Sequence, residues 1–243
     1  MAVRGGARAV SRGAEIAAGL AAVDERVQRA CAAAGRSRAE VTVVVVTKTF
    51  PVADIRLLAE LGVRDIGENR DQEAGPKAAE CADLRLTWHF VGQLQTNKAR
   101  SVARYASVVH SVDRPRLVDA LAAAAAANDR LVGCLVQVSL DDDRQRRLGR
   151  GGVSADQVMG LADRIAARSR LRLLGVMAVT PLDAEPAVAF DRLAGIAAAV
   201  RTRHPGATWI SAGMSEDLEA AIAAGATHLR VGSAILGRRA TAG

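Results

Sequence analysis

The 243-residue chain has few aromatic residues and few cysteines. Only 2% of its residues are Phe, Trp or Tyr although 50% are hydrophobic, so its core must be assembled mainly from Ala, Val, Leu and Ile. Such a core suits helices that cover a parallel sheet. Cys31, Cys81 and Cys134 show no CxxC or Cys/His spacing, which argues against a disulfide framework or a zinc site. We therefore expect no bound metal and a reducing, cytoplasmic location.

Long apolar runs are also lacking. No segment approaches the ~18 uninterrupted apolar residues of a membrane span. The apolar stretch after the first arginines is interrupted by Glu15 and Asp24, unlike the core of a signal peptide. We expect no membrane association, a mobile Gly/Arg-rich tail at residues 1–12, and a single domain over residues 13–243, because single α/β barrels commonly have this length.

Lysine is rare, and the positive charge is almost entirely arginine. The 33 basic residues comprise 30 arginines and three lysines, and the formal net charge is +7. Such a charge permits binding to nucleic acid. However, the arginines are spread among 26 acidic residues, with one local cluster at 144–150 that resembles a solvated loop. We expect no nucleic-acid partner, and a basic interaction module is kept as a rival hypothesis.

Short β-like runs alternate with helical patterns along the chain. The runs cover residues 41–47, 63–67, 87–92, 107–112, 131–140, 171–179, 208–212 and 228–232. The helical patterns cover residues 14–34, 52–61, 72–82, 97–105, 114–127, 154–169, 185–203 and 215–224, with a short turn of helix after 233. Eight strands joined by helices favour a single (β/α)8 TIM barrel with an extra N-terminal helix; an open doubly wound sheet is the alternative.

Lys48 stands at the end of an apolar run, 41–47, that has the pattern of a strand buried on both faces. Burial disfavours the charged form of an amine and makes it available as a nucleophile for a carbonyl. The ordinary alternative is a lysine that reaches from the barrel rim into water. In a barrel of this kind, function lies at the carboxyl ends of the strands, so we examine those positions.

Two turns near the end of the chain have the composition of a phosphate site. The segments 211–215 (Ser-Ala-Gly-Met-Ser) and 232–233 (Gly-Ser) each join a β-run to a helix start. Such turns offer free backbone N–H groups, glycine allows close approach of an anion, and serine adds a hydroxyl donor. Helix capping alone would explain either turn. Together they predict a phosphate-binding site after strands 7 and 8. A ligand held there by its phosphate could also react with the amine of Lys48.

Other polar residues lie at or near strand ends. Arg230, just before the second turn, can form a salt bridge inside the barrel or can face a ring nitrogen or a carboxylate. Glu68, Asn69 and His89 are candidates for ligand contacts at the rim, with Asn69 preferred over His89 because a histidine at such a place is as often structural.

Several segments together resemble the pyridoxal phosphate homeostasis protein family. The segments are 46–48 (Val-Thr-Lys), 67–69 (Gly-Glu-Asn), 88–98 (Trp-His-Phe-Val-Gly-Gln-Leu-Gln-Thr-Asn-Lys), 211–217 (Ser-Ala-Gly-Met-Ser-Glu-Asp) and 230–237 (Arg-Val-Gly-Ser-Ala-Ile-Leu-Gly). The resemblance spans nearly the whole chain after residue 12 and implies a single barrel similar to the N-terminal domain of alanine racemase. It also implies a cofactor, pyridoxal 5'-phosphate.

The resemblance implies a role for each candidate residue. Lys48 carries the cofactor's aldehyde as a Schiff base. Ser211, Gly232 and Ser233 bind its phosphate, and Gly213 shapes the first turn. The remaining implied contacts are Arg230, which faces the pyridine nitrogen, and Asn69 and Met177, which line the cofactor's surroundings.

These roles favour a binding protein over a committed catalyst. A guanidinium only donates hydrogen bonds, so Arg230 keeps the pyridine unprotonated and the cofactor a weak electron sink. We expect no racemase-type second domain, and the sole tyrosine, Tyr105, has no reason to lie at the ring. The chain is therefore expected to store, buffer or deliver pyridoxal phosphate, as a monomer, to apo forms of enzymes that use it. The alternative is an amino acid racemase-like enzyme dependent on the same cofactor.

Overall fold

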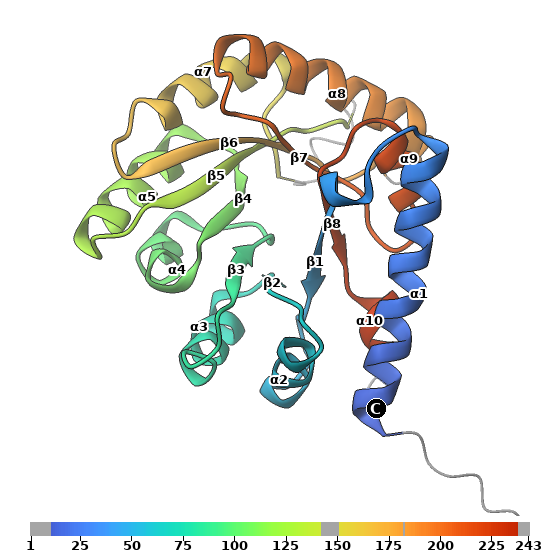
Figure 1. Cartoon of the computed structure of the whole chain (residues 1–243). Helices are drawn as coiled ribbons and strands as arrows, with labels where there is room; N and C mark the ends of the chain where they lie inside the picture. The colour runs from blue at the N-terminus through green and yellow to red at the C-terminus, as the bar shows by residue number, and fades with distance from the viewer. Residues whose placement is uncertain (1–10, 142–150, 182, 238–243) are drawn as a thin grey trace, which may run out of the picture.

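Eight parallel strands close into a barrel in the computed structural model, which describes residues 11–141, 151–181 and 183–237 (Figure 1). The strands are β1 (Thr42–Val46), β2 (Asp65–Glu68), β3 (Thr87–Phe90), β4 (Val108–Val112), β5 (Val132–Gln137), β6 (Leu171–Met177), β7 (Trp209–Ser211) and β8 (His228–Val231). They pair in sequence order, and β1 closes the barrel against β8. The predicted TIM barrel is confirmed, and the open sheet is excluded.

The helices surround the barrel, as Figure 1 shows. Their bounds are α1 (Arg12–Ala33), α2 (Val52–Glu60), α3 (Asp71–Glu80), α4 (Ala99–Tyr105), α5 (Pro115–Ala127), α7 (Ala155–Ala166), α8 (Pro186–Arg203), α9 (Leu218–Ala223) and α10 (Ser233–Leu236). Two short 3-10 helices are η1 (Arg38–Glu40) and η2 (Thr96–Lys98). Among the described helices, none has both the length and the hydropathy needed to cross a membrane.

The extra N-terminal helix, α1, belongs to the barrel's outer layer. Its buried residues recur at helical spacing, at Ile16, Val23, Val27 and Cys31. This face packs against α9 and α10, so that the first helix lies beside the last two (Figure 1). The helix therefore covers the side of the barrel where β1 meets β8.

The folded chain begins earlier than the sequence predicted. Ser11 caps α1 by accepting a hydrogen bond from the backbone N–H of Ala14, and Arg12 is helical. The Arg12 guanidinium donates to Asp54 at 2.7 Å and to the Leu236 carbonyl at 3.0 Å, joining both ends of the domain. Residues 11 and 12 are thus structural rather than part of a tail. The rest of the predicted tail, residues 1–10, lies outside the described residues.

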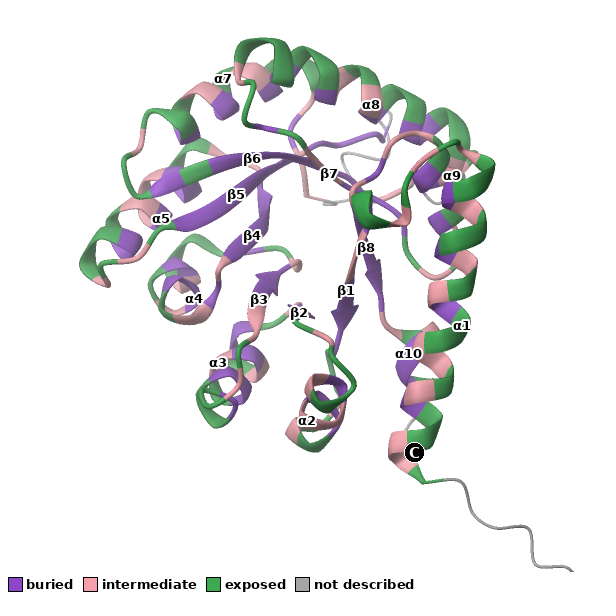
Figure 2. Cartoon of the chain, in the orientation of Figure 1, coloured by how far each residue is buried: buried purple, intermediate pink, exposed green. Residues whose placement is uncertain are grey.

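Apolar packing occupies two regions of the barrel. The larger one lies between the strands and the helices, where the helices carry their buried residues on the faces turned toward the strands (Figure 2). The smaller one, formed by Val108, Leu135, Leu174 and Met177, includes neighbouring positions on β4, β5 and β6. The side chains of His89, His110, Ser211 and Arg230, from β3, β4, β7 and β8, are also buried and are joined by hydrogen bonds. This polar group therefore spans the barrel from β3 to β8.

Candidate cofactor site

The strand ends bring the predicted residues to one face of the barrel. Because all strands are parallel, the segments that follow β1, β2, β7 and β8 emerge on the same side. Val46 pairs with Gly67, which places Lys48 and Asn69 two residues beyond a paired position on adjacent strands. Asn69 is half-buried there. The barrel topology therefore brings these strand ends to one face, and the roles of the residues there stay predictions.

Lys48 itself is exposed, which corrects the expectation of a desolvated amine. The strand ends at Val46, Thr47 is buried, and Lys48 and Thr49 form a turn in which Phe50 N–H donates to the Thr47 carbonyl at 3.1 Å. Thr49 has a φ of 67°, a conformation that is uncommon outside glycine. The turn lifts the amine out of the strand's buried surroundings, so it is accessible to a ligand in solution.

A buried ion pair lies beneath this turn. Glu68 is 1% exposed and does not contact the rim, contrary to its candidate role. Its Oε1 accepts hydrogen bonds from Thr47 Oγ1 and from Lys77 Nζ, each at 2.7 Å. Lys77 Nζ also donates to the Thr47 carbonyl at 2.9 Å. The pair therefore fixes the last residue before Lys48.

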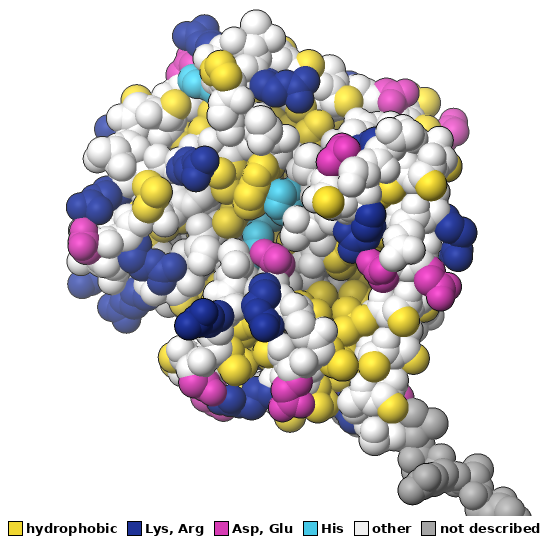
Figure 3. Space-filling model, viewed as in Figure 1, with side chains coloured by type: hydrophobic (Ala, Val, Ile, Leu, Met, Phe, Trp, Pro, Cys, Tyr) yellow, Lys and Arg dark blue, Asp and Glu magenta, His cyan; other side chains and the backbone are white. Residues whose placement is uncertain are grey.

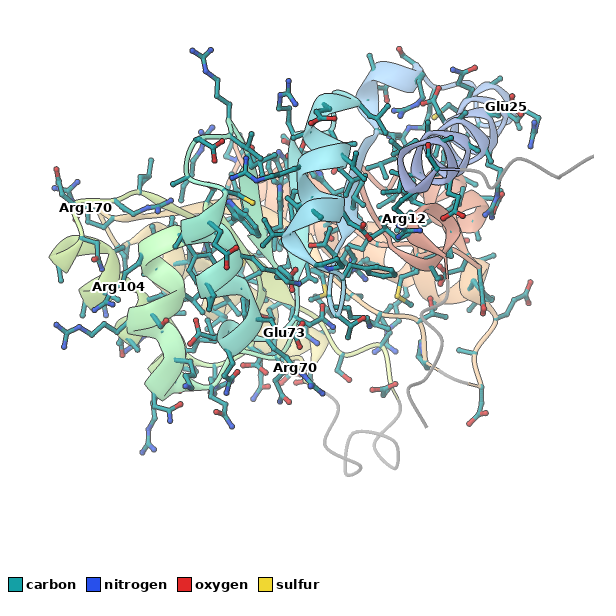
Figure 4. All side chains as sticks on the ribbon, turned by 90° about the horizontal axis from the view of Figure 1, so that it is seen from below. Arg12, Glu25, Arg70, Glu73, Arg104 and Arg170 are labelled. Atoms are coloured by element: carbon teal, nitrogen blue, oxygen red, sulfur yellow. The ribbon has the colours of Figure 1, made fainter. Side chains whose placement is uncertain are left out.

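Helix α3 holds the other side of the same turn. Glu73 Oε2 accepts a hydrogen bond from Thr49 N–H at 2.9 Å and lies 3.7 Å from Lys77 Nζ. Arg70 lies next to Glu73, at 4.0 Å, at the start of α3 (Figure 4). Sequence reasoning missed Lys77, although it is another of the three lysines and so carried the same compositional signal as Lys48.

The two phosphate turns meet. Gly213 has a φ of 90°, and an added Cβ would lie 2.6 Å from the Ala221 side chain, so only glycine fits. An added Cβ on Gly232 would lie 2.9 Å from the Val46 carbonyl oxygen, which brings the second turn against the end of β1. The hydroxyls of Ser215 and Ser233 are 3.3 Å apart. One hydroxyl from each turn thus faces the same place, and Ser215 adds a donor that the sequence prediction did not assign.

Asp217 fixes the shape of the first turn. Its carboxylate accepts hydrogen bonds from Met214 N–H at 2.6 Å and from Thr180 Oγ1 at 2.7 Å. The backbone N–H of Arg230 donates to the Gly213 carbonyl at 2.9 Å, so the first turn is also tied to β8. This turn replaces the first residues of the helix expected at 215–224, and α9 begins at Leu218.

Arg230 is buried beside the turns, 6% exposed. Its Nη1 donates to Ser211 Oγ at 2.7 Å and its Nη2 donates to the Ala178 carbonyl at 2.8 Å. Burial lowers the pKa of its guanidinium to about 10, against the opposing effect of Asp217, so the group stays charged at neutral pH. Its other three N–H groups find no acceptor among the described residues.

Ser211 begins the first turn but is more buried than Ser215 of the same turn. Its side chain is fully buried, and its hydroxyl contacts Arg230 and, at 2.9 Å, Nδ1 of His110. The Ser211 hydroxyl therefore points into the barrel interior. Binding of a phosphate by Ser211 stays a prediction. His89, considered for the rim, is buried in the same interior, and His110 was not singled out in the sequence.

The structure also shows where the remaining residues considered in the sequence lie. Met177 ends β6, is 1% exposed, and pairs with Ser211 across the sheet. Tyr105 lies on α4, where its hydroxyl donates to Asp71 at 3.4 Å and its ring meets Trp88 edge-on. The arginine cluster at 144–150 lies outside the described residues. Within the described chain, no group of three or more His, Cys, Asp or Glu side chains could hold a metal ion.

Buried neutral histidines make the stability of the fold depend on pH. Burial lowers the pKa of His228 to about 4 and lowers that of His110 well below its ordinary value. The unfolded chain binds these protons near pH 6.5, so stability is full above that pH and falls as the pH drops toward 4. We expect about 3 kcal/mol less free energy of unfolding from His228 alone at pH 4. Urea unfolding at pH 7.5, 5.5 and 4.5 checks this, and a His228→Asn chain should lose less; equal stability at all three values would contradict it.

Comparisons with known proteins agree with this geometry. A sequence profile described as "Alanine racemase, N-terminal domain" matches residues 19–240. The pyridoxal phosphate homeostasis protein of Mycobacterium tuberculosis (strain ATCC 25618 / H37Rv) is 43% identical over 248 residues, covering 94% of each chain. The protein of the same name from Escherichia coli (strain K12) is 36% identical over 231 residues, covering 93% of this chain and 97% of its own.

Solved structures show the same architecture. PipY of Synechococcus elongatus PCC7942, solved with PLP bound, has a TM-score of 0.79 and 31% identity, and the match covers 91% of this chain and 100% of PipY. A protein from Bifidobacterium adolescentis has a TM-score of 0.84 and 28% identity, covering 92% of this chain and 95% of that one. Alanine racemase from Corynebacterium glutamicum shares the fold at a TM-score of 0.63 and 15% identity; the match covers 92% of this chain and 60% of the racemase.

The barrel and its strand-end site define a protein of the alanine racemase N-terminal domain class. Within that class, relatives at 36–43% identity that match over nearly their whole length bear one common name. The chain belongs to the pyridoxal phosphate homeostasis protein family.

Proposed function

We propose that the chain binds pyridoxal 5'-phosphate as a Schiff base on Lys48 and acts in the homeostasis of this cofactor. The Lys48 amine adds to the cofactor's aldehyde and water leaves, so that a carbon–nitrogen double bond joins them. The observation that carries the proposal is that the end of β1, two residues before the exposed Lys48, lies against the Gly232 turn, whose Ser233 hydroxyl is 3.3 Å from that of Ser215 in the other turn. PipY, solved with PLP bound, supports it.

The residues present fit the cofactor. The hydroxyls of Ser215 and Ser233 and the close backbone approach at Gly232 suit a phosphate, and Gly213 allows the turn that presents Ser215. Arg230 has donors left for the ring nitrogen, and its hydrogen bond to Ser211 Oγ connects that buried hydroxyl to the proposed site. Asn69 and Met177 complete the walls.

The chemistry of this site favours storage, buffering or delivery over committed catalysis. The guanidinium donates to the ring nitrogen and gives it no proton, which weakens the cofactor's capacity to stabilise a carbanion. Names of the relatives describe homeostasis and no reaction. We further propose that the chain acts in the cytoplasm as a monomer that can pass the cofactor to apo enzymes, since the amine is exposed on a rim to which free amines have access.

The three lysines make a direct test possible. The protein is incubated with pyridoxal 5'-phosphate, reduced with borohydride and digested, and the modified peptide is identified by mass. We expect the adduct on Lys48, because Lys77 is engaged by Glu68 and the amine of Lys98 is paired with Asp71 at 4.0 Å. Absence of any adduct on Lys48 would disprove the proposed attachment.

The racemase-like alternative predicts a different result. NMR in deuterated water follows the exchange of the α-proton in a panel of amino acids, and chiral analysis follows the loss of configuration at the α-carbon. Under the proposed function, the α-proton exchanges no faster with the protein present than with free pyridoxal 5'-phosphate alone. Turnover that disappears in a Lys48→Ala chain would instead identify an enzyme.

A further inference from the structure

A chain of hydrogen bonds runs through the interior of the barrel to Arg230. It joins five side chains from β2, β3, β4, β7 and β8, beginning at the carboxylate on the first residue of β2. The distances are 3.0 Å between Asp65 Oδ1 and His89 Nε2, 2.9 Å between His89 Nδ1 and His110 Nε2, 2.9 Å between His110 Nδ1 and Ser211 Oγ, and 2.7 Å between Ser211 Oγ and Arg230 Nη1.

The two ends of the chain differ in chemistry. Asp65 is the first residue of its strand and its side chain is 30% exposed, while His89 and His110 are at most 1% exposed. Figure 3 shows histidine side chains beside an acidic one at the hollowed centre of the face in view. Arg230, at the other end, lies next to the phosphate turns. The chain thus links the amino-terminal face of the barrel to the proposed cofactor site.

The ends fix the position of every proton between them. A guanidinium only donates, so Ser211 accepts from Arg230 and must give its own hydrogen to Nδ1 of His110. His110 then carries its proton on Nε2 and donates to Nδ1 of His89. His89 in turn carries its proton on Nε2 and donates to the acceptor-only carboxylate of Asp65. In this order every hydrogen has an acceptor, and both rings are neutral.

The opposite order leaves a buried hydrogen without a partner. If His110 held its proton on Nδ1, Ser211 Oγ would receive two donors, and its own O–H would find no acceptor in a fully buried place. The charged and titratable groups around the two histidine rings are Arg230, His228 and Asp65. The ring of Trp209 stacks on His228 and His89, with distances between ring centroids of 3.7 Å and 6.5 Å. Burial, the neighbouring histidines and Arg230 lower the pKa of His110, which keeps its ring neutral.

We propose that His89 and His110 are positioning residues for Arg230: through Ser211 they present a hydroxyl oxygen that holds the guanidinium toward the ring of the bound cofactor. Asp65, on the opposite face, accepts the last hydrogen and completes the ordered chain. The inference rests on the proposed function for its ligand, whereas the proton order is a property of the protein alone. His89 touches neither Arg230 nor the turns, so an effect of His89 on the cofactor must pass through the chain.

The proton order is tested first, in the ligand-free protein. Long-range ¹H–¹⁵N NMR spectra distinguish the two neutral forms of a histidine ring. We expect His89 and His110 both to carry the proton on Nε2, and the signals of the His110 ring not to change between pH 8 and pH 6. A proton on Nδ1 of His110, or titration of its ring in this range, would overturn the ordered chain.

The positioning role is tested by two changes at one residue. His89→Phe removes the acceptor for His110, whereas His89→Asn keeps an amide oxygen near the place of Nδ1. We expect His89→Phe to weaken binding of pyridoxal 5'-phosphate about tenfold by loss of one buried hydrogen-bond partner, and to change the proton position on His110. His89→Asn should restore affinity to within about twofold and restore the His110 spectrum. His228→Asn, a buried histidine outside the chain, is the matched control.

The outcomes separate the two proposals. If the unchanged protein does not bind pyridoxal 5'-phosphate, the proposed function fails, and the NMR result still decides the proton order. If the protein binds the cofactor and His89→Phe binds it equally well, the positioning role is wrong. Should His89→Phe not fold, Asp65→Ala takes its place, with a mixed proton position on His89 and weaker binding as the expected result and unchanged binding as the contrary one.

Discussion

Replacing Lys48 with alanine is expected to abolish covalent attachment of pyridoxal 5'-phosphate to the chain. Lys48 is exposed two residues beyond Val46, which lies against the Gly232 turn, and neither of the two other lysines has that position. Lys77 has a side chain that is 11% exposed and is held by Glu68, so its amine cannot reach a ligand without breaking a buried ion pair. The absorbance of the bound cofactor and the mass of the borohydride-reduced protein both report the result.

Lys98→Ala is the matched control for this change. The side chain of Lys98 is 37% exposed and its amine lies 4.0 Å from Asp71, so the substitution removes an accessible amine while Lys48 and the serines of the two turns stay unchanged. We expect this variant to form the adduct as the unchanged protein does. Retention of a full adduct in the Lys48→Ala chain, or its loss in the Lys98→Ala chain, would show that the aldehyde is held elsewhere.

Lys77→Ala is expected to cost about 3 kcal/mol of the free energy of unfolding, the range for removing one partner of a buried ion pair. The change leaves Glu68 with one hydrogen-bond donor, Thr47, and its Oε2 already has no partner among the described residues. It also removes the donor to the Thr47 carbonyl and so loosens the turn that carries Lys48. Urea unfolding measures the first effect, and the extent of adduct formation at a fixed time measures the second.

A double change distinguishes loss of pairing from loss of packing. Lys77→Met combined with Glu68→Leu removes both charges and keeps most of the volume, so it should recover most of the stability lost by Lys77→Ala. Lys98→Ala, at a partly exposed pair, should change stability by less than about 0.5 kcal/mol. If Lys77→Ala were no more harmful than Lys98→Ala, the ion pair beneath the turn would not stabilise the fold.

The strand pattern was predictable because it depends on short-range features. Runs of β-branched and apolar residues alternate with helical periodicity, and each of the eight predicted runs overlaps a strand of the barrel, although β2 extends to Glu68, one residue beyond its predicted run. The two turns could be predicted for the same reason, since the conformational freedom of glycine and the hydroxyl donor of serine are local properties. The common face of the site followed from the topology, because parallel strands of a barrel end on one side.

Two local predictions failed where a turn intervened. Lys48 was expected to share the burial of the preceding run, but the strand ends at Val46 and the turn at Lys48 and Thr49 directs the amine outward. The helix expected from Ser215 begins at Leu218, because the Asp217 carboxylate binds Met214 N–H and holds the intervening residues in a turn. In both places, a hydrogen bond to a particular side chain or carbonyl overrode the pattern.

The sequence by itself determined the barrel, the amine at the end of β1 and the two phosphate turns, because each depends on residues close together in the chain. Only the tertiary structure decided which side chains those features meet. Ser211 and His110 are 101 positions apart, yet their side chains are in contact, and Ser215 and Ser233 come from different turns. Such pairs form only when closure of β8 onto β1 fixes the distances across the barrel. Those distances cannot be predicted from composition or from the spacing of residues in the sequence.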